Sequence, residues 1–192
     1  MGTSAKVLAP ADVRRLEAFA RRGRLPARNQ VIINLSFMAG LRACEIAGLD
    51  WSMVVTARHS IGESLFVADD IAKNGRGRNV PMHPKLRDVL TKLHAAQGRP
   101  VEGPVVRSQR GGHMTPRSIV NWFHVYYRAL GLNGCSSHSG RRTFITRSAR
   151  LVSKVGGSLR DVQELAGHSS LTTTERYIEG NREAQRKLVR ML

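Results

Sequence analysis

Residues 136–148 read SSHSGRRTFITRS, a basic stretch in which a histidine stands three residues before an arginine. The spacing predicts a helix near 138–153 that presents His138 and Arg141 on one face, because residues three apart are neighbours on a helix. Arg offers a planar fork of donors for two phosphate oxygens, and His exchanges a proton near neutral pH. The pair suits phosphate chemistry, but it also arises by chance on basic helices, so its surroundings must decide.

Five more side chains of related chemistry lie in three other segments of the chain. They supply two further cations, a carboxylate, an imidazole and a phenol, a set that suits attack on a DNA phosphate without a metal. They are Arg42 and Glu45 in MAGLRACEIAGLDW (38–51), Lys73 in DIAKNGRGRNVP (70–81), and His168 and Tyr177 in LAGHSSLTTTERYIE (165–179).

Composition points to a polyanionic partner. The chain has 192 residues, with 31 Lys and Arg against 14 Asp and Glu, which gives a formal net charge of +17. At 41% hydrophobic and 23% charged residues it has the composition of a folded domain with a sizeable core. The excess of positive charge favours nucleic acid, with binding that weakens steeply as salt rises.

The sequence argues against the other partners that a basic chain attracts. No run approaches the roughly 20 apolar residues that a membrane span needs, and the opening MGTSAKVLAP lacks the apolar stretch of a signal peptide. Two cysteines, Cys44 and Cys135, are too few for a disulfide framework or a zinc site. We therefore expect a reduced, cytoplasmic setting and no membrane partner.

Periodicity predicts an α+β domain that is mainly helical. Helical spacing of apolar residues covers most of the chain, including a central helix over 28–48. Three short β-rich runs separated by turns predict a small three-stranded antiparallel sheet, namely WSMVV (51–55), SLFVADDI (64–71) and RNVPM (78–82). Thr115-Pro116 is typical of a helix start, and Ser158 with Asp161 of a helix cap. Four further helices are expected near 138–153, 158–166, 171–178 and 181–191.

Taken together, the motifs resemble the catalytic domain of the tyrosine recombinase (phage integrase) family, over about residues 8–185. The resemblance is carried by GLR-x-x-E, the VP after the hairpin, R-x-TF-x-T, SSLTTTERY and the ordered set Arg42, Lys73, His138, Arg141, His168 and Tyr177. It implies a site-specific DNA recombinase of the integrase, invertase or resolvase type. It also implies that strands are cut and rejoined through a 3′-phosphotyrosine, with no metal and no cofactor.

The resemblance implies a role for each residue at the phosphate. Tyr177 is the expected nucleophile, and Arg42 and Arg141 are expected to hold the non-bridging oxygens. His168 is expected to donate a hydrogen bond to the phosphate. Glu45 is expected to support the site by orienting Arg42 or His138.

Two residues are expected to move protons. By the same resemblance, Lys73 protonates the departing 5′ oxygen and His138 handles the proton of the tyrosine. From the residues alone, Arg76 and Arg78 next to Lys73 compete for the acid role. Tyr126 and Tyr127 lie on the apolar stripe of their helix and are predicted to be core residues, although each carries the same nucleophilic group as Tyr177.

The chain departs from the common family pattern at three positions. Gly140 stands where the family often has Leu, Arg142 stands where it often has His, and Ala166 precedes Gly167 in place of Leu. None of these removes a reacting group. Gly140 is expected to loosen its helix turn by about 1 kcal/mol relative to Ala.

The resemblance also implies an organisation. We expect a disordered segment at 1–7, the catalytic domain at 8–180, and a C-terminal helix at 181–192 that either folds back or is exchanged between protomers. The expected partners are double-stranded DNA, further copies in a tetramer on synapsed DNA, and accessory DNA-bending proteins. The expected location is the bacterial cytoplasm, on the nucleoid.

The sequence leaves alternatives open for both the extent of the chain and its function. Family members usually carry a helical core-binding domain before the catalytic one, so the chain is either a fragment or similar to the compact fimbrial phase-variation recombinases. Two alternative functions are a type IB topoisomerase, which uses related chemistry, and a DNA-binding protein that does not cleave.

Overall fold

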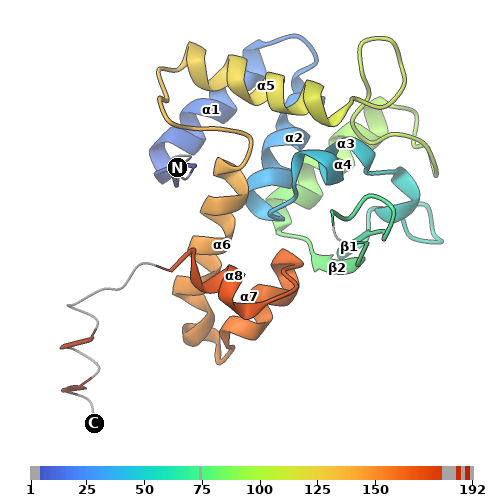
Figure 1. The fold of residues 1–192 in the computed structure, drawn as a ribbon. Helices are drawn as coiled ribbons and strands as arrows, with labels where there is room; N and C mark the ends of the chain where they lie inside the picture. The colour runs from blue at the N-terminus through green and yellow to red at the C-terminus, as the bar shows by residue number, and fades with distance from the viewer. Residues whose placement is uncertain (1–4, 74, 179–184, 187–188, 191–192) are drawn as a thin grey trace.

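The computed structural model describes residues 5–73, 75–178, 185–186 and 189–190. Helices dominate, and one antiparallel hairpin lies at the edge of the molecule (Figure 1). The elements are α1 (Pro10–Arg22), α2 (Pro26–Met38), α3 (Ala43–Gly48), the 3₁₀ helix η1 (Trp51–Met53), β1 (Ser64–Val67), β2 (Arg78–Pro81), α4 (Pro84–Ala96), α5 (Pro116–Ala129), α6 (Ser139–Leu151), the 3₁₀ helix η2 (Val152–Val155), α7 (Leu159–Ala166) and α8 (Leu171–Glu175). The predicted α+β, mainly α fold is confirmed.

Local chemistry sets the helix starts. Proline stands at the beginning of α1, α2, α4 and α5, where its missing N–H has no helical partner to lose. The Thr115 side chain accepts from Ser118 N at 3.1 Å and caps α5. At the start of α7, Ser158 N donates to the Asp161 carboxylate at 2.7 Å. Both predicted caps are confirmed.

The main core is organised around α2, which contacts α1, α4 and α6. Every residue from 29 to 37 is buried, as expected for a helix that is apolar on more than one face. The predicted continuous segment 28–48 is divided, however. Gly40 adopts φ +64°, and the chain bends there before α3 begins at Ala43. A side chain at Gly40 would run into the ring of Phe144, so the bend needs glycine.

The sheet has two strands among the described residues, so the predicted third strand is wrong. β1 and β2 pair antiparallel, with Leu65 opposite Val80. Residues 51–53 form η1 instead, because the Asp50 carboxylate accepts from Ser52 N at 3.0 Å and turns the chain into a helical cap. Trp51 is fully buried there, so the apolar residues of 51–55 reflect burial of a short helix and not an extended strand.

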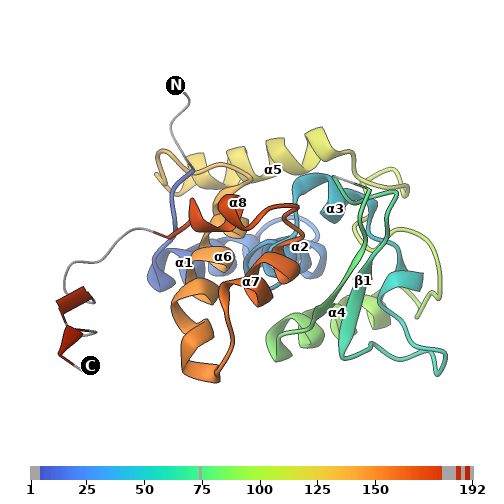
Figure 2. The same cartoon turned by 60° about the horizontal axis from the view of Figure 1, so that its bottom comes forward.

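A second, much smaller apolar group lies under α7 and α8. Its buried members are Ile145, Val162 and Ala166, with Phe144 and Tyr177 among the partly buried residues packed against it. We call this group the small cluster. Helix α6 begins against the main core and ends in the small cluster, and α7 lies beside β2 in both views (Figures 1 and 2). Tyr177 therefore belongs to a region with little apolar burial of its own.

The sequence predicts a disordered segment at 1–7 and a C-terminal helix at 181–192. Within 1–7, residues 5–7 are described, and Lys6 N donates to Gly134 O at 3.3 Å. Residues 1–4 lie outside the described residues, as does most of the predicted helix 181–192. Gln185, Arg186 and Val189 are helical and exposed, and exchange of this segment stays a prediction.

Candidate active site

Arg42 stands where α2 and α3 meet. It caps α3: its backbone N–H donates to Glu45 Oε2 at 2.9 Å, and its Nη1 donates to Glu45 Oε1 at 2.9 Å. The Glu45 side chain is fully buried, whereas the Arg42 side chain keeps 15% of its surface exposed. The cap therefore fixes the base of Arg42 and leaves part of its side chain exposed. Glu45 thus contacts Arg42 directly, and its expected supporting role stays a prediction.

A second arginine shares the same carboxylate. Arg78 donates from Nη1 to Glu45 Oε1 at 3.0 Å and from Nη2 to Glu45 Oε2 at 2.9 Å. Its Nε donates to Leu165 O at the end of α7, at 3.1 Å. Burial alone would raise the pKa of Glu45, but the hydrogen bonds and charges of Arg78 and Arg42 outweigh it and the pKa is lowered. Glu45 is therefore a permanent anion between two cations.

Arg141 is buried and holds two backbone carbonyls. Nη1 donates to Gly40 O at 2.7 Å, and Nη2 donates to Ala166 O at 2.5 Å. Burial, followed by the positive charge of Arg42, lowers its pKa to about 10, so it stays a cation at neutral pH. Arg141 thus ties the bend after α2 to the last turn of α7.

His168 follows the C-terminal cap of α7 and is 8% exposed. Its Nδ1 lies 2.9 Å from Thr174 Oγ1 in α8. Burial, followed by the charges of Arg141, Arg42 and Arg78, lowers its pKa to about 4. The imidazole is therefore neutral at physiological pH.

Tyr177 lies just beyond α8 against this imidazole. The His168 and Tyr177 rings stack with centroids 5.5 Å apart. The guanidinium carbon of Arg142 lies 5.6 Å from the centre of the Tyr177 ring, within the range of a cation–π contact. Thr146 Oγ1 donates to Tyr177 O at 3.3 Å and fixes the backbone. The phenol is placed by contacts with α6 and with the corner around His168.

His138 and Lys73 lie at the rim. Both side chains are exposed, with His138 immediately before α6 and Lys73 in the loop between β1 and β2. Partial desolvation of the imidazole, followed by the charges of Lys73, Arg141 and Arg42, lowers the pKa of His138. The effect of Lys73 on this pKa means that the hairpin loop brings its ammonium near His138. A neutral imidazole at neutral pH is the result.

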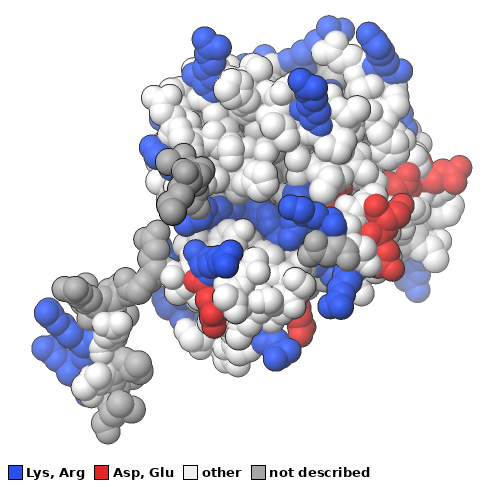
Figure 3. Space-filling view, in the orientation of Figure 1, with Lys and Arg blue, Asp and Glu red and all other residues white. Residues whose placement is uncertain are grey.

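The structure thus gathers six of the predicted residues in one place, with Lys73 on the loop beside them. Arg78 is the addition: sequence reasoning treated it as a rival acid, whereas its side chain is 8% exposed and its three donor groups are bound to Glu45 and α7. Tyr126 and Tyr127 do not join the site. Figure 3 shows Lys and Arg side chains crossing the middle of this face, between the main body and the α7–α8 region.

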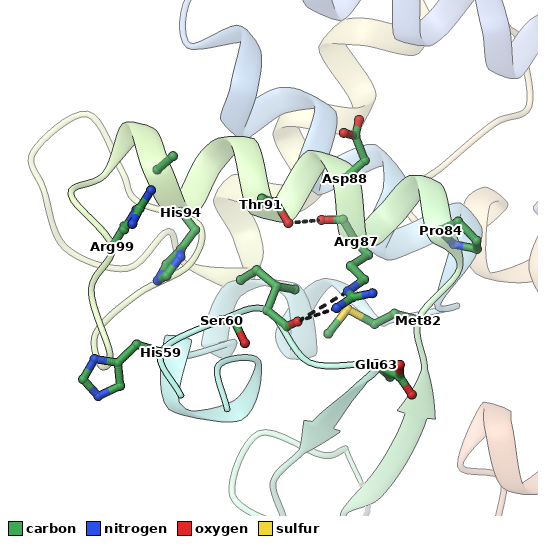
Figure 4. A pocket seen from close by; sticks show the side chains of 12 residues that line it. His59, Ser60, Glu63, Met82, Pro84, Arg87, Asp88, Thr91, His94 and Arg99 are labelled. Carbon is green, nitrogen blue, oxygen red and sulfur yellow. Dashed lines mark hydrogen bonds between the residues drawn. The ribbon is translucent and has the colours of Figure 1, made fainter. Parts of the chain in front are cut away.

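A separate cavity of about 870 Å³ lies against α4 and is lined by none of the predicted residues. Figure 4 shows Arg87 and His94 on α4 and Arg99 in the loop after it, and Arg87 Nη2 donates to Ile61 O at 3.3 Å. Within the described part of the chain no three His, Cys, Asp or Glu side chains gather as metal ligands do. In the same residues, no helix is long and apolar enough to cross a membrane.

Known proteins of similar sequence identify the family of this chain. The sequence model of the phage integrase family matches residues 6–184. The chain belongs to the phage integrase family. It is 36% identical over 180 residues to the tyrosine recombinase XerC of Bradyrhizobium diazoefficiens, an alignment that covers 91% of this chain and 52% of that protein. The XerC of Myxococcus xanthus is 31% identical over 164 residues, covering 81% and 51%. The chain spans about half the length of these relatives.

Solved structures of integrases and recombinases share the fold. The integrase of transposon Tn1549, in complex with transposon right end DNA, superposes with a TM-score of 0.76 at 17% identity, over all of this chain and 67% of that one. The XerA recombinase gives 0.72 at 22% identity, over 98% and 66%. At these identities the likeness establishes the fold.

One departure from the common family pattern has a structural reason in this integrase-family chain. Gly140 is buried against α2, and a Cβ there would overlap the Ser36 side chain. The position is therefore a close helix contact, and the expected loosening of the α6 turn is offset by the approach of α6 to α2.

Proposed function

We propose that this chain is the catalytic domain of a site-specific DNA recombinase, which cuts and rejoins DNA strands through a 3′-phosphotyrosine. The single observation that carries the proposal is the position of Tyr177. Its ring stacks on His168 at 5.5 Å, and its hydroxyl is near enough to influence the pKa of Arg141. Family membership supports the same reading.

The chemistry follows from the placement of the charges. The Tyr177 oxygen attacks phosphorus, the P–O5′ bond breaks, and the departing 5′ oxygen takes a proton from the Lys73 ammonium. Arg42 and Arg141 stabilise the negative charge that builds on the non-bridging oxygens. Attack by a 5′ hydroxyl on the phosphotyrosine reverses each step, so strand joining needs no external energy source. Metal is not required by this scheme, because fixed cations provide the positive charge.

The two histidines fit different tasks. His138 is exposed and its pKa is lowered, so it is neutral and able to accept the Tyr177 proton. His168 is also neutral, and the Thr174 hydroxyl can donate to its Nδ1, which leaves the Nε2–H free to donate to the phosphate. The same ring supports the phenol by stacking.

The partners follow from charge and kinship. A net charge of +17 and the band of cations across the site suit the backbone of double-stranded DNA. The integrase of transposon Tn1549 has been solved in complex with transposon right end DNA and with circular intermediate DNA. We further propose assembly as a tetramer on synapsed DNA, help from DNA-bending proteins, and action in the bacterial cytoplasm on the nucleoid. Exchange of 181–192 between protomers would couple the active sites.

Covalent trapping tests the function. The protein is incubated with a pool of nicked or 5′-phosphorothiolate DNA fragments, and covalent adducts are isolated under denaturing conditions. We expect an adduct at the 3′ phosphate that Tyr177→Phe does not form and that EDTA leaves unchanged. Adducts that persist in Tyr177→Phe would show that the nucleophile is wrong, and an adduct that needs Mg²⁺ would rule out the metal-free scheme.

The same assay separates the competing functions. DNA retardation without any adduct selects a binding protein that does not cleave. Relaxation of supercoiled DNA with no sequence preference selects a type IB topoisomerase. Sequencing the trapped fragments identifies the target site if the recombinase proposal is correct.

A further inference from the structure

Arg78 lies where three parts of the site meet. It is the first residue of β2, at the base of the loop that carries Lys73, and it pairs with Val67 across the hairpin. Its guanidinium reaches α3 through both oxygens of Glu45 and α7 through Leu165 O. A lysine could not make these three contacts, since its single ammonium lacks the planar fork that binds both oxygens of a carboxylate.

The side chain also defines the corner before His168. Gly167 adopts φ +61°, and a Cβ there would lie 3.0 Å from both Cδ and Nη1 of Arg78. The stem of Arg78 therefore rests on the backbone of Gly167, and the corner that turns α7 toward His168 is built around it. Arg78 supports both the chain next to the imidazole and the carboxylate next to Arg42.

The Glu45 carboxylate decides what Arg42 can do. It accepts four hydrogen bonds, of which Arg78 supplies two and Arg42 supplies two, one from its backbone N–H. The Arg42 guanidinium is left with one contact to Glu45, and it makes no other hydrogen bond within the described residues. Without Arg78, the buried Glu45 carboxylate would have free lone pairs, and the Arg42 guanidinium would bind both of its oxygens in a bidentate pair.

We propose that Arg78 is a positioning residue that keeps Arg42 available for the DNA phosphate, by occupying both oxygens of Glu45 while it anchors the end of α7. Arg42 then points a guanidinium edge toward the substrate rather than toward Glu45. This inference rests on the proposed function, because it specifies which protein group competes with the phosphate for Arg42.

The test compares two substrates whose phosphates differ in charge. A duplex recovered by covalent trapping is made with a normal scissile phosphate and with a methylphosphonate, in which a methyl group replaces one non-bridging oxygen. The rate of adduct formation is measured for wild type, Arg78→Lys and Arg78→Gln. Since the neutral phosphonate has less charge for Arg42 to stabilise, a defect that acts through Arg42 shrinks on it.

We expect both Arg78 variants to lose about tenfold or more in adduct rate on the phosphate, and less than about threefold on the phosphonate relative to wild type. Arg87→Lys is the matched control: Arg87 also holds a backbone carbonyl, that of Ile61, through Nε and Nη2, at the cavity away from the site. It should lose equally little on both substrates.

The outcomes separate the two proposals. Equal losses on both substrates in both Arg78 variants would overturn the inference, because a general loosening of the fold does not depend on phosphate charge. No adduct with the wild-type chain would overturn the recombinase proposal, and the inference with it. A selective loss on the phosphate supports both.

Discussion

The main core and the small cluster under Tyr177 are held together by different interactions. The main core packs α1, α2, α4 and α5 with large apolar side chains, and Arg42 stands on its surface. The small cluster has three buried apolar residues, and α7 is held to the rest of the molecule by Arg78 and Arg141, which donate to Leu165 O and Ala166 O. Arg42 is thus attached to the region with the larger apolar core, whereas Tyr177, the expected nucleophile, lies in the region that we expect to have lower local stability.

The largest effect should come from emptying the main core. Phe123 is fully buried and packs edge-on to Trp122 at 5.1 Å. Phe123→Ala should lower the free energy of global unfolding by about 3–5 kcal/mol, the usual cost of a large core cavity. Urea unfolding measures it, with Val125→Ala on the exposed face of α5 as the control. A loss below about 1 kcal/mol would mean that this core is not cooperative.

The same kind of change in the small cluster should stay local. Val162 is 1% exposed, and Val162→Ala should cost roughly 2 kcal/mol. We expect the loss mainly as faster amide hydrogen exchange in α7 and α8, with the exchange of α2 unchanged. Val155→Ala, at an exposed position of η2, is the matched control. If α2 and α7 lose protection equally, the two regions form one cooperative unit and the distinction fails.

Acid should act on the same region. The pKa of His168 is about 4 in the folded chain against an ordinary 6.5, so between these values the unfolded chain binds a proton that the folded chain does not. Protonation of His168 therefore costs no stability above pH 6.5, and the free energy of unfolding falls as the pH drops from 6.5 toward 4. We expect a loss on the order of 1–2 kcal/mol, which His168→Gln should largely abolish. An unchanged pH profile in the variant would assign the loss to another group, such as His138.

The smallest effect concerns one hydrogen bond. Thr174 is fully buried, and Thr174→Val keeps its shape while removing the hydroxyl that meets His168. The expected cost is about 1 kcal/mol in unfolding free energy, with a slower adduct rate because the imidazole is less firmly placed. Thr172→Val, exposed on the same helix, is the control. A wild-type adduct rate in Thr174→Val would show that this bond does not orient His168.

The sequence carried most of the fold and of the site, because local patterns encode both. Prolines and caps marked the helix starts, and the ordered motifs led to Arg42, His138, Arg141, His168 and Tyr177. The strand expected at 51–55 was wrong because burial of Trp51 and Val54 leaves the same apolar pattern in a short helix as in a strand. The bend at Gly40 leaves no signal in the sequence for a related reason, since the residues on both sides of it are buried and apolar.

The features that the sequence does not predict are contacts between residues far apart along the chain. Arg78 and Glu45 are 33 residues apart, and Arg78 meets Leu165 across a further 87. No spacing rule links such positions, so Arg78 looked like one more cation of the turn. Gly140 was similarly misjudged from its helix alone, because its reason is the Ser36 side chain of another helix.

The two arginine contacts to the end of α7 have a consequence for how this region tolerates sequence change. Arg78 and Arg141 bind the main-chain oxygens of Leu165 and Ala166, which every amino acid possesses. The identity of residue 165 can therefore drift without loss of docking, whereas residue 166 is limited only by the space around its buried side chain. An alanine in place of the leucine common in the family changes packing volume there and leaves the attachment of the region that carries Tyr177 intact.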